Sequence, residues 1–151
     1  MKEQFITFET AKLAKEKGFD IPTIQFYTSG KKAYLSEAED YMTERYAESN
    51  WNNGRGSYPT EPEKVSCSAP TQSLLQKWLR EEYSIYVTAL PYRDSEAEIE
   101  LCFYYSLIQG SEELDDILCN EDHLGASSEN FDSYEKALEK GLQEALKLIE
   151  L

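Results

Sequence analysis

The clearest pattern of apolar and polar positions lies at residues 71–83, where apolar side chains recur at intervals of three and four. These side chains are Leu75, Trp78, Leu79 and Tyr83. Such spacing places them on one face of an α-helix, with Gln72, Gln76, Lys77 and Arg80 on the other, polar side. Pro70 comes just before the segment, and proline is tolerated in a first helical turn because the amide hydrogen it lacks would have no partner there. The pattern predicts an amphipathic helix.

The same periodicity predicts helices at 7–18 and 133–150. Thr7 is a candidate N-cap for the first, and Gly18 follows its last lysine. The second has Asp132 or Ser133 as its N-cap. Its apolar positions lie along one side, at Tyr134, Leu138, Gly141, Leu142, Ala145, Leu146 and Ile149. A weaker stripe at 36–48, where Ser36 and Glu39 can form a capping box, favours a helix over a loop.

Strict alternation replaces the helical spacing at residues 84–90 and 98–108. The side expected to be buried carries Ile85, Val87 and Ala89 in the first run, and Ile99, Leu101, Phe103, Tyr105 and Leu107 in the second. Two alternating runs joined by a short polar connector predict an antiparallel hairpin with one buried and one wetter face.

Shorter signals organise the rest of the first half. Ile24 and Phe26 alternate with polar neighbours and indicate a strand that ends at a turn around Gly30, after which residues 33–35 can return. Residues 49–67 are rich in Gly, Pro, Asn and Ser, which predicts a long irregular insertion.

These elements predict one α+β domain over residues 1–151. A small antiparallel sheet centred on the hairpin is covered on one face by the helices at 71–83 and 133–150. A chain of 151 residues, of which 40% are hydrophobic, can bury a core without disulfides or metals.

The net charge of -14 makes the surface repel nucleic-acid phosphates and anionic lipids, so neither direct nucleic-acid binding nor a membrane partner is expected. The same charge is compatible with a protein that imitates DNA and occupies a basic groove, with acidic runs at 36–48 and 112–122. Ordinary solubility is the simpler interpretation of an acidic surface.

The chain has three widely spaced cysteines and a single histidine, and these residues form no zinc motif. No cofactor is expected. We expect Cys102 to be a small buried side chain in the hairpin, with Cys67 and Cys119 in loops or at element ends. The chain has no apolar leader segment and no window long enough to span a bilayer, so a reducing cytoplasm is the expected location.

No catalytic constellation stands out. His123 lies in an acidic stretch, where a solvated imidazole is a simpler interpretation than a catalytic base. The nearby carboxylates lack the alternating spacing and central glycine of a calcium loop. The sequence therefore favours a protein that is not an enzyme.

Candidate partner contacts are of two kinds. Trp51, Arg55 and Tyr58 lie outside any periodic pattern in a Gly-rich stretch, where they either contact a partner or pin the loop to the core. The acidic candidates are Glu112, Glu113, Asp115 and Asp116. Trp78, by contrast, lies within an apolar stripe, which predicts core packing.

Three blocks carry a resemblance: "FETAKLAKEKGF", "APTQSLLQKWLRE" and "SYEKALEKGLQEALKLI". Together they resemble an uncharacterised family of small proteins encoded by phages, prophages and mobile elements of gut Bacteroidetes. The resemblance implies a genomic setting and transfers no catalytic or ligand residue. We therefore predict a non-enzymatic, protein-binding accessory protein of a phage or mobile element. The alternatives are a small-ligand binder or enzyme with a carboxylate and tyrosine site, and an acidic DNA-mimic inhibitor.

Overall fold

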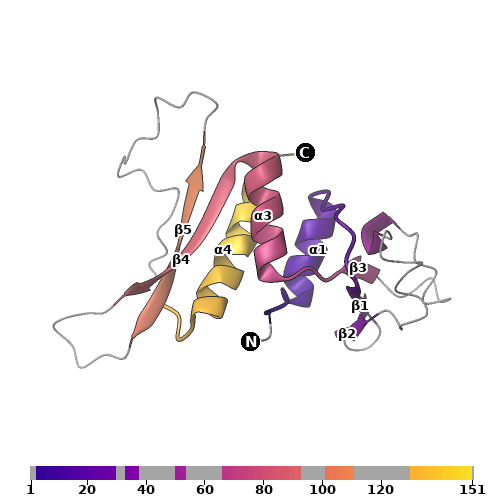
Figure 1. Ribbon diagram of the computed structural model, residues 1–151, viewed down its shortest axis with the longest axis horizontal. Coiled ribbons are helices and arrows are strands. Elements are labelled where there is room, and N and C mark those ends of the chain that lie inside the picture. The colour runs from indigo at the N-terminus through magenta and orange to yellow at the C-terminus, as the bar shows by residue number, and fades with distance from the viewer. Residues whose placement is uncertain are drawn as a thin grey trace. The chain divides into compact units, whose positions relative to one another are not determined.

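The computed structural model describes residues 3–29, 33–37, 50–53, 66–92, 101–110 and 130–150 (Figure 1). In chain order the elements are α1 (Phe8–Glu16), β1 (Gln25–Ser29), β2 (Ala33–Glu37), the 3-10 turn η1 (Trp51–Asn53), β3 (Ser66–Ser68), α3 (Gln72–Tyr83), β4 (Ile85–Tyr92), β5 (Cys102–Gln109) and α4 (Tyr134–Leu148). Helices and antiparallel strands confirm the α+β class.

The chain divides into two compact units, an N-terminal unit at Met1–Thr71 and a C-terminal unit at Gln72–Leu151. The expectation of a single domain stays a prediction, and each unit is described by itself.

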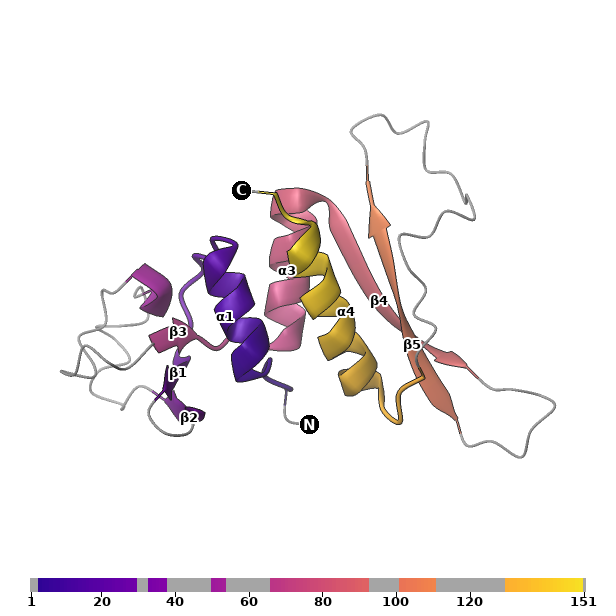
Figure 2. The same ribbon diagram turned by 180° about the vertical axis from the view of Figure 1, so that it is seen from behind.

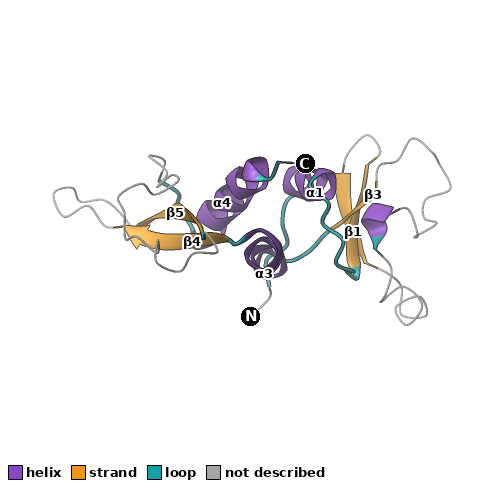
Figure 3. Ribbon diagram, turned by 90° about the horizontal axis from the view of Figure 1, so that it is seen from above, coloured by secondary structure: helices purple, strands orange, loops and turns teal. Residues whose placement is uncertain are grey.

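The C-terminal unit is built on the predicted hairpin. β4 and β5 pair antiparallel from Ile85 opposite Gln109 to Tyr92 opposite Cys102. Helices α3 and α4 lie together against this hairpin (Figure 2), and the view from above shows strands and helices as two layers (Figure 3). A sheet with helices packed on one face is therefore confirmed.

The alternation of β4 is confirmed residue by residue, because Ile85, Val87 and Ala89 are buried while the residues between them are exposed. In β5 the expected buried face is buried fully only at Leu107. The expectation for Leu101 is wrong, since its side chain is 53% exposed. It precedes Cys102, the first residue of β5 to pair with β4.

Two glutamines of α3, expected on its solvent side, instead make contacts within this unit. The Gln72 side-chain amide donates to the Glu135 carbonyl and to Glu139 Oε2 of α4, both at 2.9 Å. The Gln76 amide donates to the Val87 carbonyl of β4 at 2.5 Å. The polar side of α3 therefore helps to orient the helix, because a buried amide needs partners such as these.

The start of α4 is attached to the hairpin through the backbone. Phe131 and Phe103 exchange two hydrogen bonds, each 2.8 Å long. Two residues later, the Ser133 side chain accepts from Lys136 N and caps the helix, which confirms one of the two predicted N-caps.

Gly141 allows α4 to approach the hairpin closely. A methyl group on this residue would lie 2.8 Å from Val87 Cγ1 and 2.9 Å from Tyr105 Cβ. Both distances are shorter than carbon atoms tolerate. The predicted apolar stripe included Gly141, but its close contact depends on the opposing strands.

Gly141→Ala is expected to lower the free energy of unfolding by about 1 to 3 kcal/mol, the usual cost of overpacking a core. Helix propensity alone would change stability in the opposite direction, by roughly 1 kcal/mol. Urea denaturation followed by circular dichroism measures the net effect. Because Val87→Ala removes the closest atom, the cost of Gly141→Ala should shrink in that background. A more stable Gly141→Ala protein would contradict this packing.

The N-terminal unit contains α1 and a three-stranded antiparallel sheet in the order β2-β1-β3. Thr7 caps α1 by accepting from Thr10 N, and Gly18 follows the helix with a φ of 84°, in the left-handed region that glycine adopts readily. The helix at the N-terminus and the strand pair around Gly30 are thereby confirmed.

Two expectations for this unit are corrected. No helix begins at Ser36, because Ser36 and Glu37 end strand β2; residues 38–49 lie outside the described part of the chain. The stretch at 49–67 is not irregular throughout, since it contains η1 and begins β3, which pairs with β1. Strand pairing overrides the local composition at both places, because β2 forms a hairpin with β1 and β3 pairs with β1 from about forty residues later.

Candidate functional site

Trp51, the first of the sequence candidates, is packed inside the N-terminal unit. Its side chain is 3% exposed, and its ring stacks on Phe26 with the centroids 4.1 Å apart and the planes at 21°. Its indole Nε1 donates to the Thr23 carbonyl at 2.6 Å. Both the apolar ring and its polar atom therefore serve the fold, and contact with a partner would require the side chain to leave this position.

The two asparagines beside Trp51 extend this anchoring. The Asn50 amide donates to the Asp20 carbonyl at 2.8 Å, and the Asn52 amide donates to the Phe19 carbonyl at 2.7 Å. The Asn52 side-chain oxygen also accepts from Ser68 N of β3 at 2.9 Å. Residues 50–52 thus tie the segment after α1 to strand β3. The sequence did not indicate this role for the two asparagines, because Asn in a Gly-rich stretch is typical of turns.

The remaining sequence candidates lie outside the described residues. These are Arg55, Tyr58, Glu112, Glu113, Asp115 and Asp116, and the same holds for His123 and Cys119. Their suggested contacts with a partner stay predictions. Trp78 is buried, as the sequence predicted, and its ring meets that of Tyr83 edge-on at 5.0 Å.

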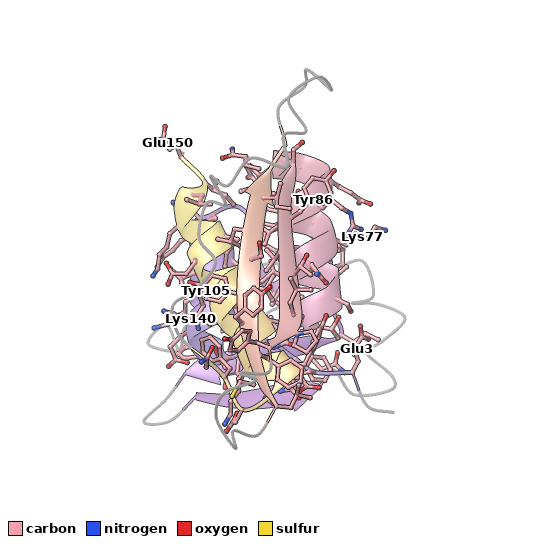
Figure 4. All side chains as sticks on the ribbon, turned by 90° about the vertical axis from the view of Figure 1, so that its left-hand side faces the viewer. Glu3, Lys77, Tyr86, Tyr105, Lys140 and Glu150 are labelled. Atoms are coloured by element: carbon pink, nitrogen blue, oxygen red, sulfur yellow. The ribbon has the colours of Figure 1, made fainter. Side chains whose placement is uncertain are left out.

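The hairpin exposes four large side chains, Tyr86, Leu90, Tyr92 and Ile108. We call the surface that they form the open face. Their exposed fractions are 45%, 38%, 47% and 54%. In β4, Tyr86 and Leu90 alternate with the buried Ile85, Val87 and Ala89, and Ile108 of β5 pairs directly with Tyr86. Figure 4 views the hairpin with its strands in front of the two helices and labels Tyr86.

The composition of the two strands is also distinctive. Neither β4 (IYVTALPY) nor β5 (CFYYSLIQ) contains a charged residue, although 29% of the chain is charged. An antiparallel sheet with one solvated face normally places polar side chains there. Here that face carries the exposed Tyr86, Leu90, Tyr92 and Ile108, together with Thr88 and its cross-strand partner Ser106, which is buried. The uncharged runs were visible in the sequence, which predicted a wetter face without recognising that large apolar and tyrosine side chains lie on it.

Neither metal-ligating groups nor the Glu144 carboxylate indicates a reactive site among the described residues. Within the described ranges, His, Cys, Asp and Glu nowhere gather in groups of three that could hold a metal ion. Glu144 Oε1 accepts from Lys140 Nζ and Lys147 Nζ, both at 2.8 Å, and these hydrogen bonds lower the pKa of its carboxyl. A lowered pKa suits a paired surface carboxylate, whereas a general acid needs a raised one.

No described helix has the length and apolarity to cross a membrane.

The cysteines differ from expectation. Cys67 is fully buried within β3, whereas Cys102, expected to be buried, is only partly so at the start of β5. Burial raises the pKa of the Cys67 thiol from 9.0 to about 11, and the positive charges of Lys15 and Lys12 offset only part of this rise. A buried thiol with a raised pKa is chemically inert at neutral pH.

Cys67 is expected to resist alkylation in the folded protein. With the pKa raised by burial, its thiolate fraction at about pH 8 falls roughly a hundred-fold, and burial also blocks the reagent. Iodoacetamide labelling followed by peptide mapping should show slow modification of Cys67 in the folded protein and rapid modification after unfolding in urea. Rapid labelling of native Cys67 would contradict its burial.

The raised pKa of Cys67 also makes stability depend on pH. The neutral thiol contributes stability below pH 9.0, and this contribution is lost as the pH rises towards 11.

Comparison with known proteins adds no assignment: no family model, curated protein or solved structure matches this chain.

Proposed function

We propose that this chain is a non-enzymatic accessory protein that acts by binding another protein through the open face. The observation that carries the proposal is the row of exposed apolar side chains on two strands that contain no charge. Single exposed apolar residues are ordinary, but several on one face of a sheet are typical of interaction sites. Here Tyr86 and Ile108 are direct cross-strand partners, and Leu90 and Tyr92 follow on the same face of β4.

The chemistry of the open face suits protein binding. Tyrosine is enriched among the residues that dominate binding energy, because it combines a large apolar ring with a hydroxyl and has few rotatable bonds. Tyr86 and Tyr92 lie on a paired strand whose other face packs on the helices, so their backbone is already ordered. Little conformational entropy is therefore lost when a partner covers them.

The setting is part of the same proposal. The three sequence blocks at 8–19, 69–81 and 133–149 support an accessory role in a phage or mobile element. The cytoplasm is the proposed location, supported by the free thiols of Cys67 and Cys102.

Affinity capture with a tagged chain tests the proposal. The wild type is compared with Ile108→Lys, which places a charge in the open face, and with Ile24→Lys. Ile24 is a matched control because it is an isoleucine of the N-terminal unit that is 41% exposed. Since both residues are exposed, neither change should unfold the protein. A partner identified by mass spectrometry is then purified and titrated with each variant.

The expected result is a partner that binds the wild type and Ile24→Lys equally and binds Ile108→Lys at least about ten-fold more weakly, since a charge facing an apolar surface must be desolvated. Equal binding of all three proteins would overturn the open face as the binding surface. An enzymatic activity that survives Ile108→Lys would overturn the non-enzymatic role.

A further inference from the structure

The hydrogen-bonding pattern of the hairpin decides which backbone groups of β4 face β5. Gly110 N donates to the Ser84 carbonyl at 2.9 Å, and these two residues continue the β4–β5 register by one position. In an antiparallel pair, opposed residues alternate between hydrogen-bonded and non-bonded positions. Every second residue of β4 therefore turns its backbone groups away from β5, and these residues are Ile85, Val87, Ala89 and Pro91. The bonds between Phe103 and Phe131 agree with this pattern, since Phe103 stands opposite Pro91.

The outer side of β4 is an edge of the sheet, because within the described part of the chain β5 is the only strand that pairs with β4. Unpaired backbone groups on such an edge can pair with a strand of another chain. Three features of β4 favour such pairing: it is eight residues long, it pairs with β5 one residue to one, and it contains no charged residue. Charged side chains, which protect many natural edges, are therefore not used on this strand.

Two other residues interrupt this edge. Gln76 of α3 reaches it, and its side-chain amide donates to the outward-facing Val87 carbonyl at 2.5 Å. In Figure 4, α3 lies behind β4, on the side of that strand away from β5. Pro91 is the second interruption, because it has no amide hydrogen to donate from its outward position. Between the two, Ala89 is the one outward-facing residue, which is too short a stretch to pair with a strand.

We propose that Gln76 and Pro91 close the outer edge of β4 to strand addition by a second copy of this chain. The two edges of the hairpin then differ in kind: on β5, Phe131 pairs with Phe103 through the backbone, whereas on β4 a side-chain amide and a proline take the place of a strand. The inference does not rest on the proposed function. It leaves the side chains of the open face as the part of the hairpin that is accessible to a partner.

Three variants test this role: Gln76→Met, Pro91→Thr and the two changes combined. Methionine is similar in length to glutamine but lacks the amide donor, and threonine restores a backbone amide hydrogen and suits a strand. Gln72→Met is the matched control. It removes another glutamine amide of α3, with its two hydrogen bonds to α4, but it leaves the edge of β4 closed. Sedimentation velocity over a range of protein concentrations measures association, and hydrogen exchange monitored by NMR reports the Ala89 amide.

We expect the wild type and Gln72→Met to remain monomers at concentrations at which the double variant self-associates. In the associated double variant the Ala89 amide should exchange at least about ten-fold more slowly than in the wild type, because it becomes paired with a strand. Pro91 is exposed, so Pro91→Thr should fold even if the change at Gln76 does not allow folding, and it should associate more weakly than the double variant.

Three results would overturn the inference. A double variant that stays monomeric would show that the edge needs no protection. Association of Gln72→Met equal to that of Gln76→Met would make loss of stability the cause. A wild-type dimer with a protected Ala89 amide would show that the edge is in use. None of these results changes the effect of Ile108→Lys on capture of a partner, so the proposed function is tested separately.

Discussion

Replacing Trp51 by alanine is expected to lower the free energy of unfolding of the N-terminal unit by about 3 to 5 kcal/mol, the range for a buried aromatic side chain. The change removes the ring stacked on Phe26 and leaves a cavity. It also leaves the Thr23 carbonyl without the indole donor that lies 2.6 Å away. A loss of this size would show that the Trp51 side chain stabilises the fold of the N-terminal unit.

Hydrogen exchange monitored by NMR is the suitable measurement, because it reports the β1 amides separately from those of the C-terminal unit. Trp51→Phe serves as the control: it keeps an aromatic ring against Phe26 but loses the indole donor, so its cost should be smaller. If Trp51→Ala melts like the wild type, the indole is dispensable for folding, and contact with a partner becomes the better explanation of this residue.

Trp78→Ala is expected to destabilise the C-terminal unit by a similar amount, about 3 to 5 kcal/mol. Trp78 is 3% exposed on the face of α3 that also buries Leu75 and Leu79, and its loss removes the edge-on contact with Tyr83.

Thermal and urea unfolding measure this cost, with Lys77→Ala as the neighbouring control. Lys77 is exposed, and its Nζ lies 3.9 Å from Glu81 Oε1. Because a surface ion pair of this kind contributes little to stability, the free energy of unfolding of Lys77→Ala should stay within about 0.5 kcal/mol of the wild-type value. A Trp78→Ala protein with near-wild-type melting would show that the apolar stripe of α3 does not face the core.

The sequence by itself determined the elements whose pattern is local. The stripes of α3 and α4 and the alternation of β4 repeat over eight or more residues, so each element carries its own record of which side is buried. The caps at Thr7 and Ser133 were readable because capping needs residues only three positions apart. Acidity and the absence of charge in the hairpin were likewise present in the sequence.

Only the tertiary structure decided the features that depend on residues far apart in the chain. Cys67 is buried because β3 pairs with β1, about forty residues earlier, and three residues are too few to show a period. Trp51 and its two asparagines find their partners at residues 19–26 and in β3. The open face exists because both helices pack on the opposite side of the hairpin. A local pattern states that a strand has two unlike faces, but the packing of other elements decides which face is left to a partner.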